Sequence, residues 1–323
     1  MLRWSKIAGV SLLLLLEGCT HSSRLLTRAE IPPAPAYPRL LAVYESWFGH
    51  PMHISVGYSS QDPVEIGKQI DHAKQLGISG FVVDWYGDRE PFIDRSYALI
   101  QSLAAQRHFS VAMMYDESDG DVQQATDDAL AAFDKFDRTY LAPDAAGREA
   151  YLTYEGRPVI FIFPKSGHTN WNRVRQMVDR WSSPPLLIYE YRTTEYAAAM
   201  NGFYAWINPG EKGWATDGSH WGGDYLSHFY QAMRTKYPEK ITVGAAWPGF
   251  DDNLASWSLN RHMSRRCGQT FNDTLKLSEE NSTPDHPLPF VLIETWNDYE
   301  EGSAIERGIA DCKPNSEATS DHN

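Results

Sequence analysis

The sequence has few cysteines and lacks the short motifs of the common metal, redox and nucleotide sites. Only three of its 323 residues are cysteine: Cys19, Cys267 and Cys312. It contains no CxxC, HExxH or Cys/His cluster, so we predict no metal site. Because no GxGxxG, GxxxxGKS or GxxxxGKT motif follows an apolar run, the nucleotide-binding folds lose support. We therefore expect no cofactor.

Basic residues are also in deficit. The chain has 29 Lys and Arg residues against 42 Asp and Glu residues, which gives a formal net charge of −13 and a pI near 5.3. This balance argues against nucleic acid and against anionic lipid surfaces as partners. It is compatible with a neutral or cationic substrate, although solubility alone would also explain it.

The apolar segment near the N-terminus is too short to span a bilayer comfortably. It covers Ile7–Leu16, follows two basic residues and has the length of a signal-peptide core. The following Glu17-Gly18-Cys19 resembles the end of a bacterial lipobox, with Glu17 in place of the usual small or aliphatic residue. We predict a lipoprotein signal peptide over residues 1–19, lipidation of Cys19 and anchoring in the bacterial cell envelope. An ordinary signal peptide is the alternative.

Two further segments read as unstructured. Residues 20–38 are rich in proline and polar residues and have no periodicity, which indicates a tether. Residues 311–323 read as a disordered tail. Between them, residues 39–310 form one predicted domain. Cys267 and Cys312 remain after Cys19, and an envelope location permits their pairing, but the sequence does not show whether they are close enough.

Within this domain, eight short apolar runs alternate with amphipathic segments. The runs are continuous, as expected for strands buried on both faces of a parallel sheet. They are Arg39–Gly49, Gly77–Gly87, Phe109–Glu117, Arg157–Phe163, Pro185–Arg192, Gly202–Pro209, Lys240–Gly249 and Pro289–Asp298. Helix signals lie between them: Asp62, for example, is a predicted N-cap, with Pro63 at the first helical position. The segments after Thr193 and from Leu254 to Leu277 carry weaker signals, and we expect the second to be irregular. The pattern predicts a single (β/α)8 TIM barrel, with a doubly wound open sheet as the alternative.

Acidic and aromatic residues recur where the predicted strands end. In such barrels the active site lies at the carboxyl ends of the strands. Aromatic faces stack on sugar rings and carboxylates bind hydroxyl groups or move protons, so the recurrence suggests a saccharide site. The predicted substrate contacts are Trp47, Asp84, Trp85, Tyr86, Tyr115, Glu190, Tyr191, Trp206, Asp251, Trp296 and Asn297.

The eighth run continues into the acidic stretch Glu294–Glu306. Strand alternation places Leu292, Glu294, Trp296 and Asp298 on the face toward the barrel interior. Asp298 and Glu301 would lie about 5–6 Å apart at their Cβ atoms if the chain turns helically. Two adjacent carboxylates raise one another's pKa, as glycoside hydrolysis requires. Alternatively, the same D-x-x-E spacing is a helix capping box.

The stretch "TWNDYEEGSAIE" resembles the end of the eighth strand in glycoside hydrolase family 99, the endo-α-mannosidases and endo-α-mannanases. It is also similar to family 71, the α-1,3-glucanases. "YESWFGHP" (Tyr44–Pro51) is similar to the first-strand segment of family 99, and "AAWPGFDD" (Ala245–Asp252) to the segment after its seventh strand. "GISGFVVDWYG" and "RPVIFIF" resemble its second and fourth strands. The resemblance spans most of residues 40–308.

The resemblance implies roles for two residues. Asp298 matches the first catalytic carboxylate of family 99, and Glu301 matches the second, the general acid/base. In that family the first carboxylate is implied to deprotonate the 2-hydroxyl of the sugar, which attacks its own anomeric carbon with net retention. Asp298 is one methylene shorter than the family's Glu and closer to the family 71 pattern, which is implied to be inverting. Both routes stay open.

The sequence thus predicts a glycoside hydrolase of the family 71/99 type. Its expected substrate is a polysaccharide or oligosaccharide with α-linkages, an α-mannan or an α-glucan, cleaved within the chain by Asp298 and Glu301. We expect a monomer. The alternative is an envelope lipoprotein that binds carbohydrate without turning it over.

Overall fold

The computed structural model describes residues 38–165, 167–192 and 195–312. Four predicted features lie outside the described residues: the signal peptide, the lipidation site at Cys19, residues 20–37 of the tether and the tail from residue 313. Within these ranges, no helix combines the length and the apolar character needed to cross a membrane.

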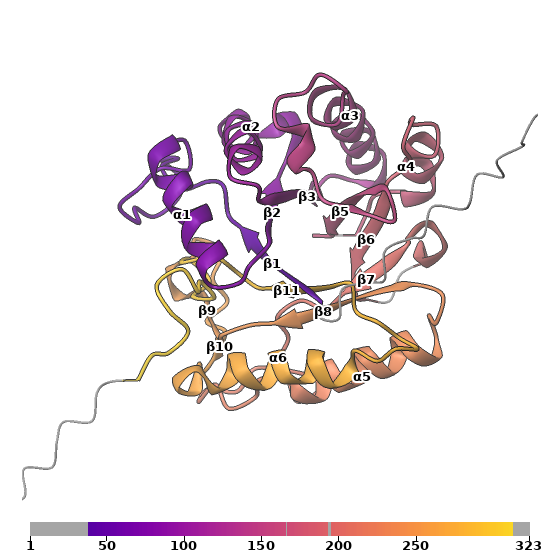
Figure 1. Cartoon of the computed structure of the whole chain (residues 1–323). Coiled ribbons are helices and arrows are strands. Elements are labelled where there is room, and N and C mark those ends of the chain that lie inside the picture. The colour runs from indigo at the N-terminus through magenta and orange to yellow at the C-terminus, as the bar shows by residue number, and fades with distance from the viewer. Residues whose placement is uncertain (1–37, 166, 193–194, 313–323) are drawn as a thin grey trace, which may run out of the picture. The chain divides into compact units, whose positions relative to one another are not determined.

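The core of the fold is a closed barrel of eight parallel strands (Figure 1). In spatial order the strands are β1 (Arg39–Tyr44), β2 (Gly80–Trp85), β3 (Ser110–Asp116), β5 (Arg157–Phe163), β6 (Leu186–Glu190), β7 (Gly202–Tyr204), β8 (Ile241–Ala246) and β11 (Phe290–Ile293). The pairing of β3 with β5, from Met113 opposite Ile160 to Asp116 opposite Phe163, completes the ring that β1 and β11 join on the other side. The predicted (β/α)8 barrel is confirmed. A short β4 (Thr153–Tyr154) pairs antiparallel with β5 outside the ring.

Strand residues alternate between two separate apolar clusters. The inner cluster fills the barrel and takes every second residue, for example Leu41 and Val43 of β1 and Leu292 of β11. The residues between them, such as Ala42 and Ile293, belong to the outer cluster under the helices. This period of two decides which side chains at the strand ends can reach the barrel mouth.

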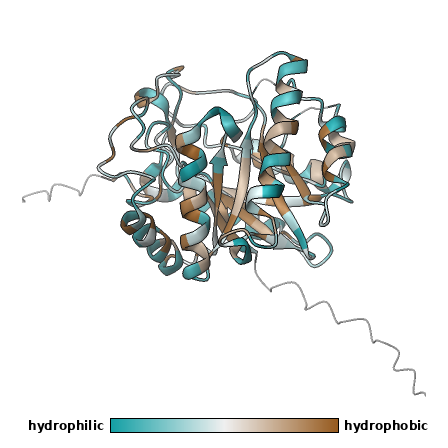
Figure 2. Cartoon of the chain, turned by 90° about the horizontal axis from the view of Figure 1, so that it is seen from above, coloured by the Kyte–Doolittle hydropathy of each residue, from teal (hydrophilic) through white to brown (hydrophobic). Residues whose placement is uncertain are grey.

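In the part of the chain that the structure describes, six α-helices surround the barrel: α1 (Pro63–Gln75), α2 (Pro91–Gln106), α3 (Val122–Tyr140), α4 (Trp171–Val178), α5 (Gly223–Thr235) and α6 (Gln269–Asn281). Figure 1 shows α5 and α6 side by side, and Figure 2 shows apolar residues gathered on the strands. Asp62 caps α1 as predicted, accepting from the backbone amides of Val64 and Glu65. Among the described residues between β6 and β7, the only helical segment is a 3₁₀ turn, Ala197–Ala199, in agreement with the weak signal there.

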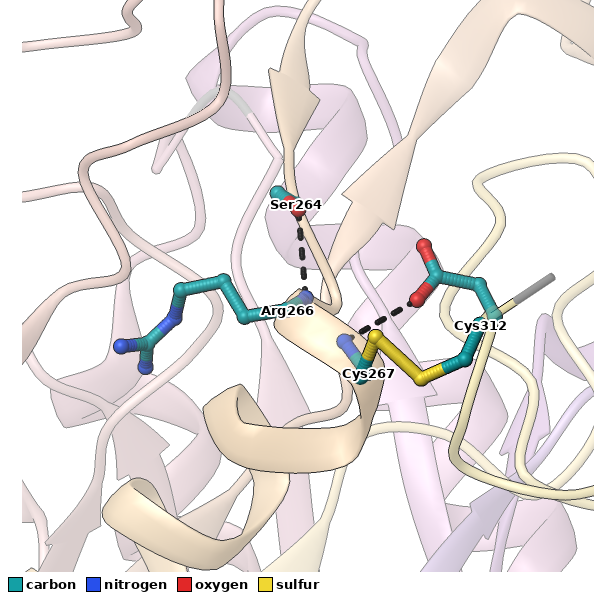
Figure 3. The surroundings of a disulfide bond; sticks show 5 residues. Ser264, Arg266, Cys267 and Cys312 are labelled. Atoms are coloured by element: carbon teal, nitrogen blue, oxygen red, sulfur yellow. Dashed lines mark hydrogen bonds between the residues drawn. A yellow bond between two sulfur atoms is a disulfide. The ribbon is translucent and has the colours of Figure 1, made fainter. Parts of the chain in front are cut away.

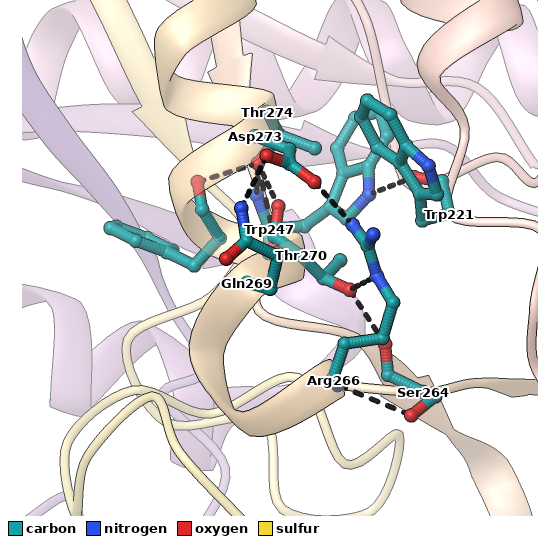
Figure 4. A network of polar contacts seen from close by, with 9 residues as sticks. Trp221, Trp247, Ser264, Arg266, Gln269, Thr270, Asp273 and Thr274 are labelled. Atoms are coloured by element: carbon teal, nitrogen blue, oxygen red, sulfur yellow. Dashed lines mark hydrogen bonds and ion pairs between the residues drawn. The ribbon is translucent and has the colours of Figure 1, made fainter.

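The expectation of an irregular segment up to Leu277 was wrong, because α6 begins at Gln269. Long-range contacts fix this helix (Figure 4). Arg266 stacks over Trp221 at 4.9 Å and its guanidinium bonds to Thr270 and Asp273. Trp247, at the end of β8, donates its backbone N–H to Thr274. Trp221 and Trp247 come from distant parts of the chain, so a local reading of the segment did not find these contacts.

The loop before α6 is joined to the end of the described chain by a disulfide between Cys267 and Cys312, with Cα atoms 4.9 Å apart (Figure 3). The backbone N–H of Cys267 also donates to Asp311. Arg265 lies two residues before Cys267 and donates to the carbonyl oxygens of residues 302, 304 and 308 at 2.7–3.0 Å. The segment that follows β11 is therefore held to the segment before α6 at several points.

Candidate active site

A cavity of about 460 Å³ lies at the carboxyl ends of the barrel strands. It is lined by Glu45, Trp47, His53, Asp84, Tyr86, Met114, Asp116, Asp119, Phe163, Lys165, Trp206, Trp257, Arg261, Asp298 and Glu301. Many of these continue the inward alternation of their strands. Glu45, for example, follows Leu41 and Val43, and Asp116 follows Ala112 and Met114. The strands thus aim carboxylates and aromatic rings into one space.

The structure brings the predicted pair Asp298 and Glu301 together in this cavity. The backbone N–H of Glu301 donates to Asp298 Oδ1 at 2.8 Å. Asp298 is 3% exposed, whereas the side chain of Glu301 is 16% exposed. Burial, and then the charge of Glu301, raises the pKa of Asp298 well above its usual range. Burial also raises the pKa of Glu301.

The carboxylate pair sits on a tight loop, and no helix follows Asp298 up to residue 312, where the described chain ends. The carbonyl of Asp298 accepts from the amides of Ser303 and Ala304, which turns the chain back on itself. Gly302 closes the turn with φ +62°, and a Cβ there would lie 2.9 Å from the carbonyl oxygen of Asp251. Asp298 therefore makes the hydrogen bond expected of a cap, but it caps a loop tip, and both carboxylates line the cavity.

Two residues from the loop between β8 and α6 contact Glu301. Trp257 donates its indole N–H to Glu301 Oε1 at 2.9 Å. Arg261 lies 3.6 Å from the same oxygen and is held by a 2.7 Å ion pair to the buried Asp252. Both contacts favour the charged form and so lower the pKa of Glu301, against the larger effect of burial.

A second group of acids lies toward the barrel interior. Burial, followed by the charges of Asp84 and Asp298, raises the pKa of Glu45 well above its usual range. Burial raises the pKa of Asp84 to about 6, and Lys165 opposes this rise. Lys165 pairs with Asp116 at 3.1 Å. One oxygen each of Glu45, Asp84 and Asp116 lies buried without a hydrogen-bond partner among the described residues. Such atoms call for a ligand that donates hydrogen bonds.

Four of the predicted substrate contacts line this cavity: Trp47, Asp84, Tyr86 and Trp206. Glu190 lines an adjoining cavity that shares Trp206 with the first. The indole N–H of Trp47 is buried and has no partner among the described residues, so this side chain can donate to a ligand while its ring stacks on His53 at 4.7 Å.

Three predicted contacts face the opposite way. Trp85 and Tyr115 occupy the alternate strand positions and belong to the outer cluster, and Tyr191, one residue past the end of β6, packs against that cluster. Trp85 and Tyr115 pack against aromatic rings of α3, and Tyr191 against a ring of α5. Their placement in the cleft is corrected, because a residue next to an inward-facing one points outward.

Three further predicted contacts are near the site without lining either cavity. Strand β11 ends at Ile293, so alternation no longer applies, and Trp296 packs outside the barrel against α1 and β2. Asn297 is buried and bonds to both backbone groups of Glu45, which fixes the end of β1. Asp251 supports the acidic loop through its backbone N–H, which donates to the carbonyl of Glu301.

Two further acids of the stretch Glu294–Glu306 are buried. Glu300 bonds to His53 at 2.7 Å and to the amide of Ile54. Glu294 forms no hydrogen bond or ion pair with a Tyr or Arg side chain among the described residues. Burial and the charge of Glu190 raise the pKa of Glu294 well above its usual range.

The main residues that sequence reasoning missed are Glu45, Asp116, Lys165, Trp257 and Arg261. The first two follow inward-facing residues of β1 and β3, so strand alternation applied to every strand would have found them. Lys165 follows β5 by two residues, and Trp257 and Arg261 come from a long loop. Nothing in their local sequence indicates that they reach the site.

Comparison with known proteins supports the fold. No protein-family model matches the chain, and no curated protein sequence is significantly similar to it. Among solved structures, it is similar to the GH99 endo-α-mannosidase from Bacteroides thetaiotaomicron, with a TM-score of 0.64 and 18% identity over 83% of this chain and 87% of that one. The same enzyme in complex with bis-tris-propane gives a TM-score of 0.63 and 19% identity over 83% and 86% of the two chains. The chain is also similar to a glycoside hydrolase-like protein, with a TM-score of 0.58 and 14% identity over 87% of this chain and 90% of that one. The resemblance to family 99 is thus confirmed at the level of the fold.

Proposed function

We propose that the protein is a glycoside hydrolase that cleaves α-linked glycans, an α-mannan or an α-glucan, within the chain. The observation that carries this proposal is the pair Asp298 and Glu301 on one loop in an aromatic-lined cavity, both with raised pKa values. Like carboxylates in a sheltered site do not both ionise readily, so one keeps a proton for the leaving oxygen. The fold shared with a GH99 endo-α-mannosidase supports the same reading.

The surroundings suggest a division of roles. Glu301 lies nearer the opening and is the proton donor, while the deeper Asp298 acts as the base, either on the sugar 2-hydroxyl or on a water molecule. The unpartnered oxygens of Glu45, Asp84 and Asp116 suit the hydroxyl groups of a bound sugar. Trp47 and Trp206 supply aromatic faces to the same ligand.

The test is a screen of α-mannans, α-1,3-glucans and β-glycans with wild type, Asp298→Asn and Glu301→Gln. We expect the wild type to cleave an α-glycan and each variant to lose most of that activity while keeping its melting temperature. Glu280→Gln, on the exposed side of α6, is the matched control. NMR of the first-formed anomer distinguishes retention from inversion. Activity retained in both variants would refute the proposal, and calorimetric binding without any product would indicate a carbohydrate-binding protein.

A further inference from the structure

A second cavity of about 380 Å³ adjoins the first, within the roughly 300–1,000 Å³ typical of ligand sites. The two cavities share a wall formed by Phe163, Trp206, Arg261 and Glu301. The second extends past this wall along Glu190, Arg192 and Trp214, which belong to the ends of β6 and to the loop after β7. The two cavities are therefore neighbours, and Glu301 borders both of them.

The two carboxylates of the pair differ in which cavity they face. Asp298 lines only the first cavity, whereas Glu301 lines both. A proton donor in glycoside hydrolysis contacts the oxygen between two sugar units, so it lies at the boundary between the reacting unit and the leaving unit. The base acts beside the reacting anomeric carbon and lies on the reacting unit's side.

From this asymmetry we infer that the second cavity binds the leaving part of the glycan. The inference rests on the proposed function and deepens it by giving the substrate a direction. The sugar whose anomeric carbon reacts occupies the first cavity, with Asp298. As its bond to the linking oxygen breaks, that oxygen takes the proton of Glu301, and the leaving sugar, now with a free hydroxyl group, departs through the second cavity. Water supplies the atoms that complete the hydrolysis.

The side chains of the second cavity suit a neutral sugar. Arg192 pairs with Glu190 at 2.9 Å. The guanidinium of Arg192 can donate to one hydroxyl group of a sugar while the carboxylate of Glu190 accepts from the adjacent one. Trp214 and Trp206 add aromatic surface. The charges of Arg192 and Glu190 balance, and Arg261 in the shared wall is paired with Asp252. This cavity therefore lacks the excess of acids that lines the first cavity.

The experiment compares two substrates of the same sugar. One is the oligosaccharide that the wild type cleaves, and the other is the α-fluoride of the corresponding disaccharide. Fluoride is small and departs as an anion, so this substrate leaves the second cavity empty and needs little help from a proton donor. The variants are Arg192→Met and Trp214→Leu in the second cavity, with Trp47→Ala in the first for comparison.

We expect Arg192→Met and Trp214→Leu to lower kcat/KM for the oligosaccharide about 10- to 100-fold, the loss of one or two good contacts, and to lower it much less for the fluoride. Trp47→Ala should lower both alike. Activity on the fluoride shows at the same time that each variant is folded. Equal losses on the two substrates, or no loss on either, would overturn the inference while leaving the hydrolase assignment intact. A wild type that cleaves neither substrate would overturn both.

Discussion

The hydrogen bond from Trp257 to Glu301 offers a direct test of which residue gives up the proton. The change is Trp257→Phe, which removes the indole N–H but keeps an aromatic ring beside Trp47 and His53. The N–H stabilises the ionised carboxylate and so lowers the pKa of Glu301. Its removal should raise that pKa. Since a proton donor is active only when protonated, the alkaline limb of the pH profile should move to higher pH.

The size of the shift follows from the geometry. A hydrogen bond to an ionised group contributes about 1.5–3 kcal/mol when it is well shielded from water. The 2.9 Å bond is short enough, but Trp257 is 41% exposed, so solvent can replace part of the bond. We take about 1 kcal/mol, and since one pKa unit corresponds to about 1.4 kcal/mol, we expect a shift of roughly 0.5–1 pH unit.

The assay is kcat/KM as a function of pH, because this ratio reports the pKa values of the free enzyme. The position of the limb is the readout, since Trp257→Phe can also weaken substrate binding and lower the whole profile. Trp181→Phe is the matched control, an indole that packs near α3 away from the cavity. An alkaline limb at the same pH in wild type and Trp257→Phe would refute the assignment of Glu301 as the proton donor governed by this contact.

Three further predictions concern the frame of the site. Arg265→Ala removes three hydrogen bonds to the loop of Glu301. The misplaced Glu301 should lower kcat about 10- to 100-fold, and Arg265→Lys should recover part of this loss. An unchanged kcat would contradict the prediction. Burial raises the pKa of Glu294 in the folded state, so this residue costs stability as pH rises above the ordinary carboxylate pKa. Glu294→Gln should therefore raise Tm more at about pH 8 than at about pH 5, and an equal change at both would contradict this. The disulfide joins two residues 45 positions apart in the sequence. Replacing Cys267 and Cys312 by Ser should lower the free energy of unfolding, measured by urea titration, by up to about 4 kcal/mol. An unchanged free energy of unfolding would argue against the disulfide.

The barrel was predictable because each of its parts has a local signal. Continuous apolar runs mark the buried strands, and capping residues such as Asp62 mark helix starts. The start of α6 was missed because part of what holds this helix comes from distant residues, such as Trp221 under Arg266 and Trp247, which bonds to Thr274. Local patterns therefore gave the architecture, and tertiary contacts decided the rest.

For the site, the acidic stretch led to Asp298 and Glu301, but the choice among neighbouring aromatic residues needed strand parity. Alternation on β2 selects Asp84 and rejects Trp85, and the same rule on β3 rejects Tyr115. The alternation of side chains does not extend beyond the end of a strand, as the residues after β11 show. It also says nothing about long loops, so the arrival of Trp257 at Glu301 could not be predicted from the sequence.

Arg265 and the disulfide join the loop after β8 to the loop after β11. This connection limits how such a barrel can evolve. One loop supplies contacts to Glu301 and the other carries it, so an insertion in either would displace the reacting groups. Descendants of this chain that acquire a new sugar preference should therefore differ in the segments after the other six strands. The loops after β8 and β11 should change little, or change together.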